Sequence, residues 1–174
     1  MTKSLLIGLL LLTSAARASA QAAGGPYTWV PVTVPYVEPP NAVKAPAING
    51  RSMVACKGTD RYGRLWAGSL AVSSNVIECH GSSSGTIEIA ITNLYVLTTT
   101  TGAQTWLLGS GSPSAANIGA LPANVVNAGN TTVNNYAQNL CAVGGYVGYT
   151  RNDVCNFPIT FGASGGWRST VLTW

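Results

Sequence analysis

Isoleucine occupies every second position in the stretch Thr86-Ile87-Glu88-Ile89-Ala90-Ile91-Thr92. Successive side chains of a strand point to opposite faces, so this period of two indicates a strand with one buried face. The stretch Trp29-Val30-Pro31-Val32-Thr33-Val34 shows the same alternation. Further short β-rich runs occupy residues 52–56, 65–72, 94–100, 105–108, 146–150 and 167–173. Clusters of Gly, Asn, Ser and Pro separate the runs, which predicts an all-β protein. Residues 113–128 could hold a turn or two of helix at most, because Gly119 and Pro122 break the run.

The composition suits a compact globular chain and narrows its partners. Of 174 residues, 47% are hydrophobic and only 8% are charged, and the net charge is +4. The 62 residues from 89 to 150 contain no charged side chain. Nucleic-acid binding depends on clustered cations that face phosphates, so we expect no nucleic-acid partner.

The N-terminus is typical of a secretory signal. Lys3 precedes an apolar run over residues 5–12, and the small residues Ala18-Ser19-Ala20 precede Gln21. We predict a signal peptide over residues 1–20, cleaved after Ala20, and hence an extracellular or periplasmic protein without a membrane span. A membrane anchor is the alternative. It needs about 20 apolar residues, which this run does not supply before Arg17 interrupts it.

Secretion predicts that the four cysteines, Cys56, Cys79, Cys141 and Cys155, form two disulfides, for which three pairings exist. A zinc site is the rival. Zinc ligands usually come in closely spaced pairs, whereas these gaps are long and His80 is the only histidine. We therefore expect neither a metal nor another cofactor.

Two halves of the chain, residues 21–101 and 102–174, carry the same landmarks in the same order. Each half has a tryptophan, a Pro-x-Asn-x-Val segment, two cysteines and a Val-Leu-Thr segment. This order predicts two tandem β repeats that share one core. It favours Cys56–Cys79 and Cys141–Cys155 as the disulfides. The cysteine offsets between the halves, 85 and 76 residues, indicate a nine-residue deletion in the second half, which we assign to the loop equivalent to residues 60–69.

The ordered landmarks resemble the DM-nine repeat family. They comprise Trp29, the Asn41-Ala42-Val43-Lys44-Ala45 segment, the strand ending at Cys56, the run Tyr62-Gly63-Arg64-Leu65-Trp66-Ala67-Gly68, then Cys79 and Tyr95-Val96-Leu97. The family includes mannose-binding lectins of molluscs and the N-terminal repeats of natterin-like toxins. The resemblance covers residues 29–172 and implies an all-β tandem-repeat protein that binds surface glycans without catalysis.

The sequence departs from this family at the places that hold the sugar. In the lectins an acidic residue follows the Asn-Ala-Val-x-Ala segment, and a lysine follows a Pro-Gly pair. Here Pro46, Ala47 and Ile48 occupy the first place and Ser69 the second, while Asn130 or Thr131 stands at the acidic place of the second half. The resemblance therefore carries over the fold more firmly than the ligand.

The longer loop of the first half offers the best candidate site for a sugar. Asp60, Arg64 and Trp66, with Arg61 and Ser69 nearby, combine a carboxylate, guanidinium groups and an aromatic face for a pyranose ring. The alternative is a hairpin tip whose tryptophan packs into the core. Asn49 and Arg51 are the nearest substitutes for the missing acidic residue, although Asn49-Gly50 is also a turn signal. Asn127, Asn130, Asn134, Asn135 and Asn139 offer further amides.

Glu78 and His80 are two residues apart, so on a strand they would share a face and could meet. The mature chain has only five carboxylates and no identifiable nucleophile, so we expect a protein that is not an enzyme. Two hypotheses remain. The first is a secreted lectin-like protein that binds surface glycans, including mannose-type ones. The second is a secreted structural or protein-interaction module that has lost the family's sugar site. Homo-oligomerisation stays open.

Overall fold

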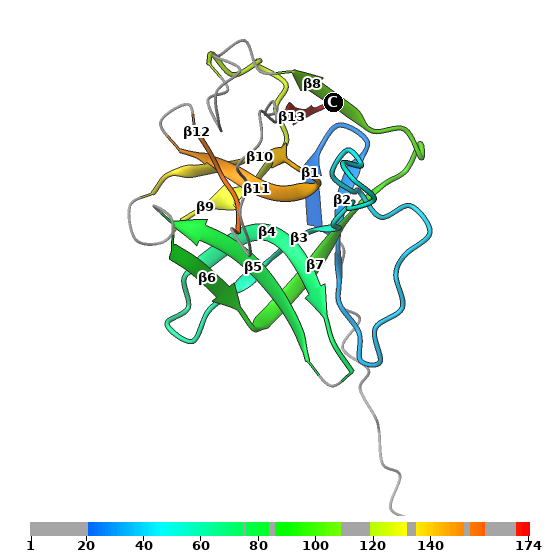
Figure 1. The fold of residues 1–174 in the computed structure, drawn as a ribbon, viewed down its shortest axis with the longest axis vertical. Helices are drawn as coiled ribbons and strands as arrows, with labels where there is room; N and C mark the ends of the chain where they lie inside the picture. Colours follow the sequence, from blue (N-terminus) through cyan, green and yellow to red (C-terminus); the bar gives the residue numbers. More distant parts are fainter. Residues whose placement is uncertain are drawn as a thin grey trace, which may run out of the picture.

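The computed structural model describes residues 21–74, 76–83, 86–108, 119–131, 135–151, 154–158 and 170–174. These residues form strands and turns and contain no helix (Figure 1). The first sheet holds β1 (Gln21–Gly24), β2 (Tyr27–Pro31), β3 (Ala55–Thr59), β4 (Leu65–Val72), β5 (Ile77–Ser83), β6 (Thr86–Ala90) and β7 (Thr92–Thr99). The second holds β8 (Thr105–Leu108), β10 (Ala137–Val143), β11 (Tyr146–Arg151), β12 (Val154–Asn156) and β13 (Thr170–Thr173), and β9 (Asn127–Asn130) pairs with β10. The all-β prediction is confirmed.

Several predicted boundaries are wrong. The alternation from Trp29 ends at Pro31, because the chain leaves the sheet there and Val34 is 86% exposed. The run over residues 52–56 begins its strand only at Ala55. Strands β5 and β10 are missing from the sequence-based prediction, although both lie inside their sheets. Their Gly, Ser, Asn and Gln residues have low strand propensity, and pairing on both sides outweighs it. Residues 1–20, and with them the predicted signal peptide, lie outside the described residues, as does the start of the run over residues 167–173.

All strand pairs are antiparallel, and the two sheets run through their strands in corresponding order. The first is ordered β1-β2-β7-β3-β4-β5-β6, and the second β12-β11-β10-β13-β8. Read from β2 and from β8, each sheet places its last strand second. The first sheet then continues through β3, β4, β5 and β6, and the second through β10, β11 and β12. Cys56 lies opposite Val96 and Gly68, while Cys141 lies opposite Val171 and Gly148.

The pairing registers show where the second sheet is shorter. Cys56 pairs with a residue twelve positions on, Gly68, whereas Cys141 pairs with Gly148, seven positions on. Five of the nine residues by which the cysteine spacings differ are therefore missing from the hairpin between β10 and β11. The other four are missing from the hairpin between β11 and β12. The nine-residue difference is thus not confined to the loop over residues 60–69, as the sequence alone had suggested.

Each disulfide joins two strands that are not neighbours. Cys56 of β3 is bonded to Cys79 of β5 across β4, and Cys141 of β10 is bonded to Cys155 of β12 across β11. This is the predicted pairing. Two steps of about 4.8 Å would place such strands nearly 10 Å apart in a flat sheet. The Cα atoms are only 5.7 Å and 5.9 Å apart, so each sheet is sharply bent at the strand that lies between the two bonded cysteines.

A glycine makes each bend sterically feasible. A Cβ atom on Gly68 of β4 would overlap the carbonyl oxygen of His80 in β5. A Cβ atom on Gly148 of β11 would overlap the carbonyl oxygen of Asn156. The obstacle in both cases is backbone, which cannot move aside without breaking the strand pairing.

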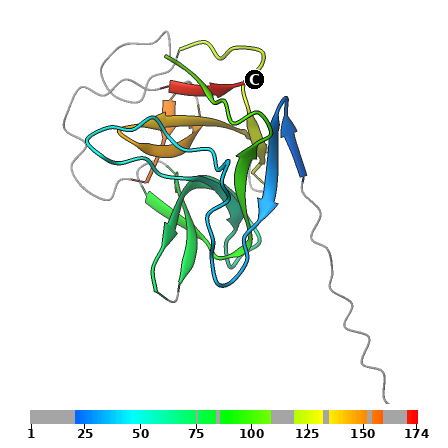
Figure 2. The ribbon, with the colours of Figure 1, turned by 90° about the vertical axis from the view of Figure 1, so that its right-hand side faces the viewer.

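The main apolar core lies between the two sheets. It contains Tyr27, Trp29 and Leu97 from the first sheet, and Leu140, Val147 and Leu172 from the second. Figures 1 and 2 show β10 and β11 stacked on the bent part of the first sheet, with β11 against β4. Lys57 reaches across this core, where its Nζ lies 4.8 Å from the centre of the Trp29 ring and donates to the Ala128 carbonyl. Desolvation by burial lowers the pKa of Lys57 to about 8.

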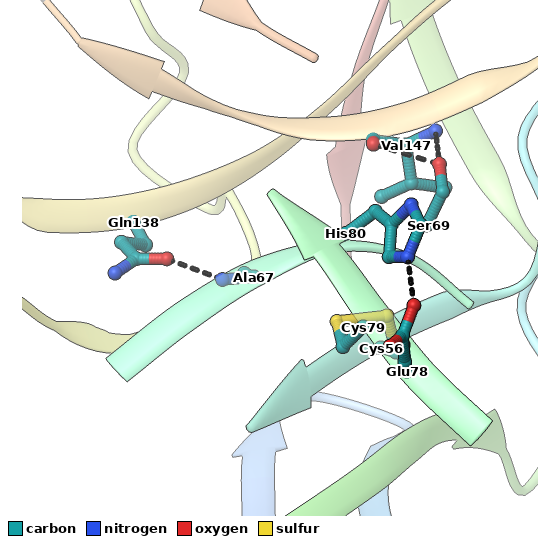
Figure 3. The surroundings of a disulfide bond; sticks show 8 residues. All are labelled: Cys56, Ala67, Ser69, Glu78, Cys79, His80, Gln138 and Val147. Carbon is teal, nitrogen blue, oxygen red and sulfur yellow. Dashed lines mark hydrogen bonds and ion pairs between the residues drawn. A yellow bond between two sulfur atoms is a disulfide. The ribbon is translucent and has the colours of Figure 1, made fainter. Parts of the chain in front are cut away.

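Two buried polar side chains also bridge the sheets (Figure 3). The Gln138 amide accepts from the Ala67 N–H at 2.6 Å and donates to the Leu65 carbonyl at 2.7 Å. The Ser69 hydroxyl donates to the Val147 carbonyl at 3.0 Å and accepts from the Val147 N–H at 2.9 Å. The side chains thus satisfy backbone groups of β4 and β11 that have no strand partner on that side.

We predict that Gly68→Ala lowers the free energy of unfolding by about 3 kcal/mol or more, since the added methyl group meets backbone. Gly63→Ala is the matched control. Gly63 has a positive φ but open space around its Cβ position, so only backbone strain of about 1 kcal/mol is expected. Urea unfolding of both variants measures the difference. Wild-type stability of Gly68→Ala would contradict the steric argument.

We predict that Gln138→Leu lowers the free energy of unfolding by about 2–4 kcal/mol, because it leaves one N–H and one carbonyl of β4 in the core without a hydrogen-bond partner. Gln104→Leu is the control, since its amide makes comparable backbone hydrogen bonds near the surface, where water can replace them. Thermal and chemical unfolding test the pair. Equal losses in the two variants would contradict a special role for burial.

Candidate functional site

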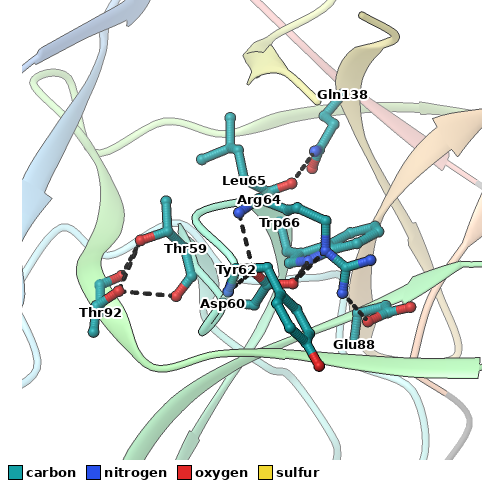
Figure 4. Close-up of polar contacts among 9 residues, drawn as sticks. All are labelled: Thr59, Asp60, Tyr62, Arg64, Leu65, Trp66, Glu88, Thr92 and Gln138. Atoms are coloured by element: carbon teal, nitrogen blue, oxygen red, sulfur yellow. Dashed lines mark hydrogen bonds and ion pairs between the residues drawn. The ribbon is translucent and has the colours of Figure 1, made fainter. Parts of the chain in front are cut away.

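The predicted sugar site at the β3–β4 hairpin is a closed structural cluster (Figure 4). The Asp60 carboxylate accepts hydrogen bonds from the backbone N–H groups of Tyr62 and Arg64, at 2.8 Å and 2.9 Å. It also accepts from Arg64 Nε at 2.6 Å and from Trp66 Nε1 at 3.1 Å. Asp60 is only 6% exposed. The two carboxylate oxygens that we expected to take sugar hydroxyls thus make hydrogen bonds within the hairpin.

Trp66 and Ser69 are likewise used by the fold. Trp66 is 6% exposed and packs against Tyr149, with ring centres 6.2 Å apart, so its face cannot stack on a sugar. Arg64 makes a second ion pair, with Glu88 at 3.3 Å. Ser69 is 1% exposed and bonds to β11. The alternative of a hairpin whose tryptophan packs into the core describes the geometry better.

The electrostatics of Asp60 follow from these contacts. Burial alone would raise its pKa, but hydrogen bonds from Trp66, Arg64 and Tyr62 outweigh burial and lower the pKa to about 2. The ordinary value is 3.8. A carboxyl group whose pKa is lower in the folded state stabilises the fold above its unfolded pKa and loses that contribution as the pH falls through the folded pKa.

We therefore predict that Asp60→Asn lowers the free energy of unfolding by about 1–3 kcal/mol at pH 7. The gap between wild type and variant should narrow as the pH falls from 4 towards 2, where wild-type Asp60 becomes protonated. Glu38→Gln serves as the control, since the Glu38–Lys44 pair is largely exposed and contributes little. Denaturant unfolding across this pH range provides the measurement. A gap that stays constant would contradict the assigned role.

Asn49 and Arg51 lie away from the Asp60 hairpin. Asn49 and Gly50, with φ of 50° and 76°, form a two-residue turn closed by backbone hydrogen bonds between Ile48 and Arg51, both 2.9 Å. The turn interpretation of Asn49 is confirmed. The turn precedes β3, whereas Asp60 follows it, and five residues of strand span roughly 16 Å. The structure therefore does not gather the six predicted ligand residues into one site.

Arg51 instead borders a pocket between the two sheets. The guanidinium carbon lies 4.6 Å from the centre of the Tyr146 ring, and Tyr146 in turn stacks on Phe157, with centres 6.4 Å apart. The pocket has a volume of about 220 Å³. It is lined by Arg51, Met53, Ser69, Ala71, His80, Tyr146 and Pro158. Arg51 and Ser69 are thus the only two predicted ligand residues that line it.

His80 brings a carboxylate beside this pocket. His80 Nε2 lies 2.7 Å from Glu78 Oε2, as expected for residues two apart on one strand (Figure 3). The site therefore combines a guanidinium donor, an imidazole–carboxylate pair and an aromatic surface. Sequence analysis missed Tyr146 and Phe157, since both come from the second half and only the packing of the sheets brings them to Arg51.

The asparagines of the second half bond mainly with one another. Asn127 Nδ2 donates to Asn139 Oδ1 at 3.1 Å, and Asn130 Nδ2 donates to Asn135 Oδ1 at 3.0 Å. Asn134 lies outside the described residues. The described residues hold no group of three His, Cys, Asp or Glu side chains arranged for a metal ion. They also hold no helix of the length and apolarity needed to cross a membrane.

Comparison with models of known protein families, with curated proteins and with solved structures finds no match to this chain.

Proposed function

We propose that this chain is a secreted, non-catalytic carbohydrate-binding protein whose site is the Arg51 pocket. The single observation that supports it is the placement of Arg51 on the Tyr146 ring, beside the His80–Glu78 pair, in a hollow between the sheets. Guanidinium and imidazole groups donate to sugar hydroxyls, and a carboxylate accepts from them. The volume is smaller than that of most drug-sized sites, which suits one sugar residue at the end of a glycan.

The resemblance to the DM-nine lectins supports the same location. Ser69, which occupies the place of the family's lysine, lines the Arg51 pocket. We also propose that residues 21–101 and 102–174 are tandem repeats of one ancestral unit. The corresponding strand orders, the matching disulfides and the glycines at equivalent registers support this view.

A structural or protein-interaction module is the second candidate. It is favoured by the observation that the polar groups of Asp60, Trp66 and Ser69 make hydrogen bonds within the fold. Under this hypothesis the protein keeps the scaffold of a lectin without its ligand.

The test is a glycan array with the wild type, followed by calorimetry on the best-bound glycan. Arg51 is exposed at the edge of the pocket. We predict that Arg51→Ala weakens binding at least tenfold, since hydrogen bonds from a charged group contribute about 1.5–3 kcal/mol. Arg61→Ala is the matched control. Arg61 also lies over a tyrosine, Tyr62, at 4.7 Å, but on the exposed hairpin tip.

Unchanged affinity of Arg51→Ala would contradict the assigned site, whereas equal losses in both arginine variants would indicate non-specific charge attraction. If the wild type binds no glycan, the carbohydrate hypothesis fails and the interaction module gains support. Circular dichroism of each variant confirms that the fold is retained.

A further inference from the structure

The Arg51 guanidinium is a cation for which the described part of the chain supplies no counter-ion. Each carboxylate side chain in that part is engaged by another group, in the pairs Glu38–Lys44, Asp60–Arg64, Glu88–Arg64 and Glu78–His80. The guanidinium of Arg51 lies on the Tyr146 ring instead, and it makes no hydrogen bond to the residues that the structure describes. Its N–H donors are therefore free to bond to a ligand.

The Tyr146 ring orients this cation and is not a platform for a sugar. The guanidinium carbon of Arg51 lies 4.6 Å from the ring centre, and Phe157 stacks on the same ring with centres 6.4 Å apart. With these two neighbours against the ring, a sugar in the Arg51 pocket must be held by polar groups and not by stacking.

His80 supplies the second polar group. It lines the pocket, and its Nε2 atom is bonded to Glu78 at 2.7 Å. The other ring nitrogen, Nδ1, lies on the side of the imidazole away from that bond and has no hydrogen-bond partner in the described part of the chain. A sugar hydroxyl both donates and accepts, so it can bond to Nδ1 in either tautomer. Glu78 is not among the lining residues, since its carboxylate turns to His80.

We propose that the Arg51 pocket binds an acidic sugar, such as a uronic acid or a sialic acid residue, with its carboxylate on Arg51 and a hydroxyl at His80 Nδ1. This inference rests on the proposed carbohydrate function and names the class of sugar. A carboxylate matches the planar fork of a guanidinium group and accepts two parallel hydrogen bonds from it. Met53, Ala71 and Pro158, which complete much of the lining, carry no charge that would compete for Arg51.

Two matched pairs of probes test the proposal: trigalacturonate with its fully methyl-esterified form, and 3′-sialyllactose with its methyl ester. Esterification removes the negative charge and leaves the sugar hydroxyls in place. We expect the full mature chain to bind at least one acid about five- to tenfold more tightly than its ester in calorimetry at about 20 mM salt. The gain is modest because Arg51 is exposed, and screening at about 0.5 M salt should reduce it.

Arg51→Gln should bring the ratio of acid to ester affinity to about one, because it removes the charge and keeps a polar side chain. Arg61→Gln is the matched control, since Arg61 is also an exposed arginine over a tyrosine but lies on the hairpin tip. It should leave the ratio unchanged. Circular dichroism checks that both variants keep the fold.

The inference is overturned if the esters bind as tightly as the acids, if Arg51→Gln keeps the wild-type ratio, or if both variants lose it alike. It is also overturned if all the glycans that the wild type binds on the array are neutral. In each of these cases the proposed carbohydrate function survives, because a glycan still binds. Absence of binding to every glycan removes both proposals.

Discussion

The close approach of β3 to β5 over β4 is the constraint on which the rest of the structure depends. A disulfide draws the two outer strands together, and Gly68 provides the space in which their backbones pass. The same device, with Gly148 beneath the Cys141–Cys155 bond, bends the second sheet. Two bent sheets present complementary surfaces, and β11 can then lie against β4. A flat sheet would keep its faces too far apart for Gln138 and Ser69 to reach backbone of the opposite sheet.

Those polar links explain how a core with so few charged residues specifies one arrangement of the sheets. Apolar contacts alone would tolerate sliding of one sheet over the other. Gln138 and Ser69 satisfy particular backbone groups, so a shift by one residue would leave donors and acceptors unpaired in the core. Lys57 adds a third fixed point, since its ammonium group rests on the Trp29 ring and donates to β9. Its lowered pKa reflects the cost of keeping a charge there.

The direction in which the side chains of β4 point explains why the Asp60 hairpin is closed while the Arg51 pocket is open. Successive residues of this strand face opposite ways, so Trp66 packs with the disulfide while Ser69 faces β11. The hairpin end is closed by Asp60, whose carboxylate has no capacity left for a ligand. The opposite end of β4 borders the Arg51 pocket, where the two sheets meet without filling the space between Arg51 and Tyr146. The open space near β4 therefore lies at the junction between the sheets and not at the hairpin tip.

The sequence by itself determined the fold class, the Asn49-Gly50 turn and the disulfide partners. These follow from the alternation of apolar and polar residues, from the Asn-Gly turn signal and from the order of landmarks in the two halves, all of which can be read directly from the sequence. It did not reveal β5 and β10, because their polar and small residues become strands only through partners on both sides. Nor did it identify the candidate site. Asp60, Trp66 and Ser69 have the residue types of a sugar site, but only the tertiary structure shows that they are buried and bonded. Tyr146 reaches Arg51, about 95 residues away in sequence, solely because the two sheets pack face to face.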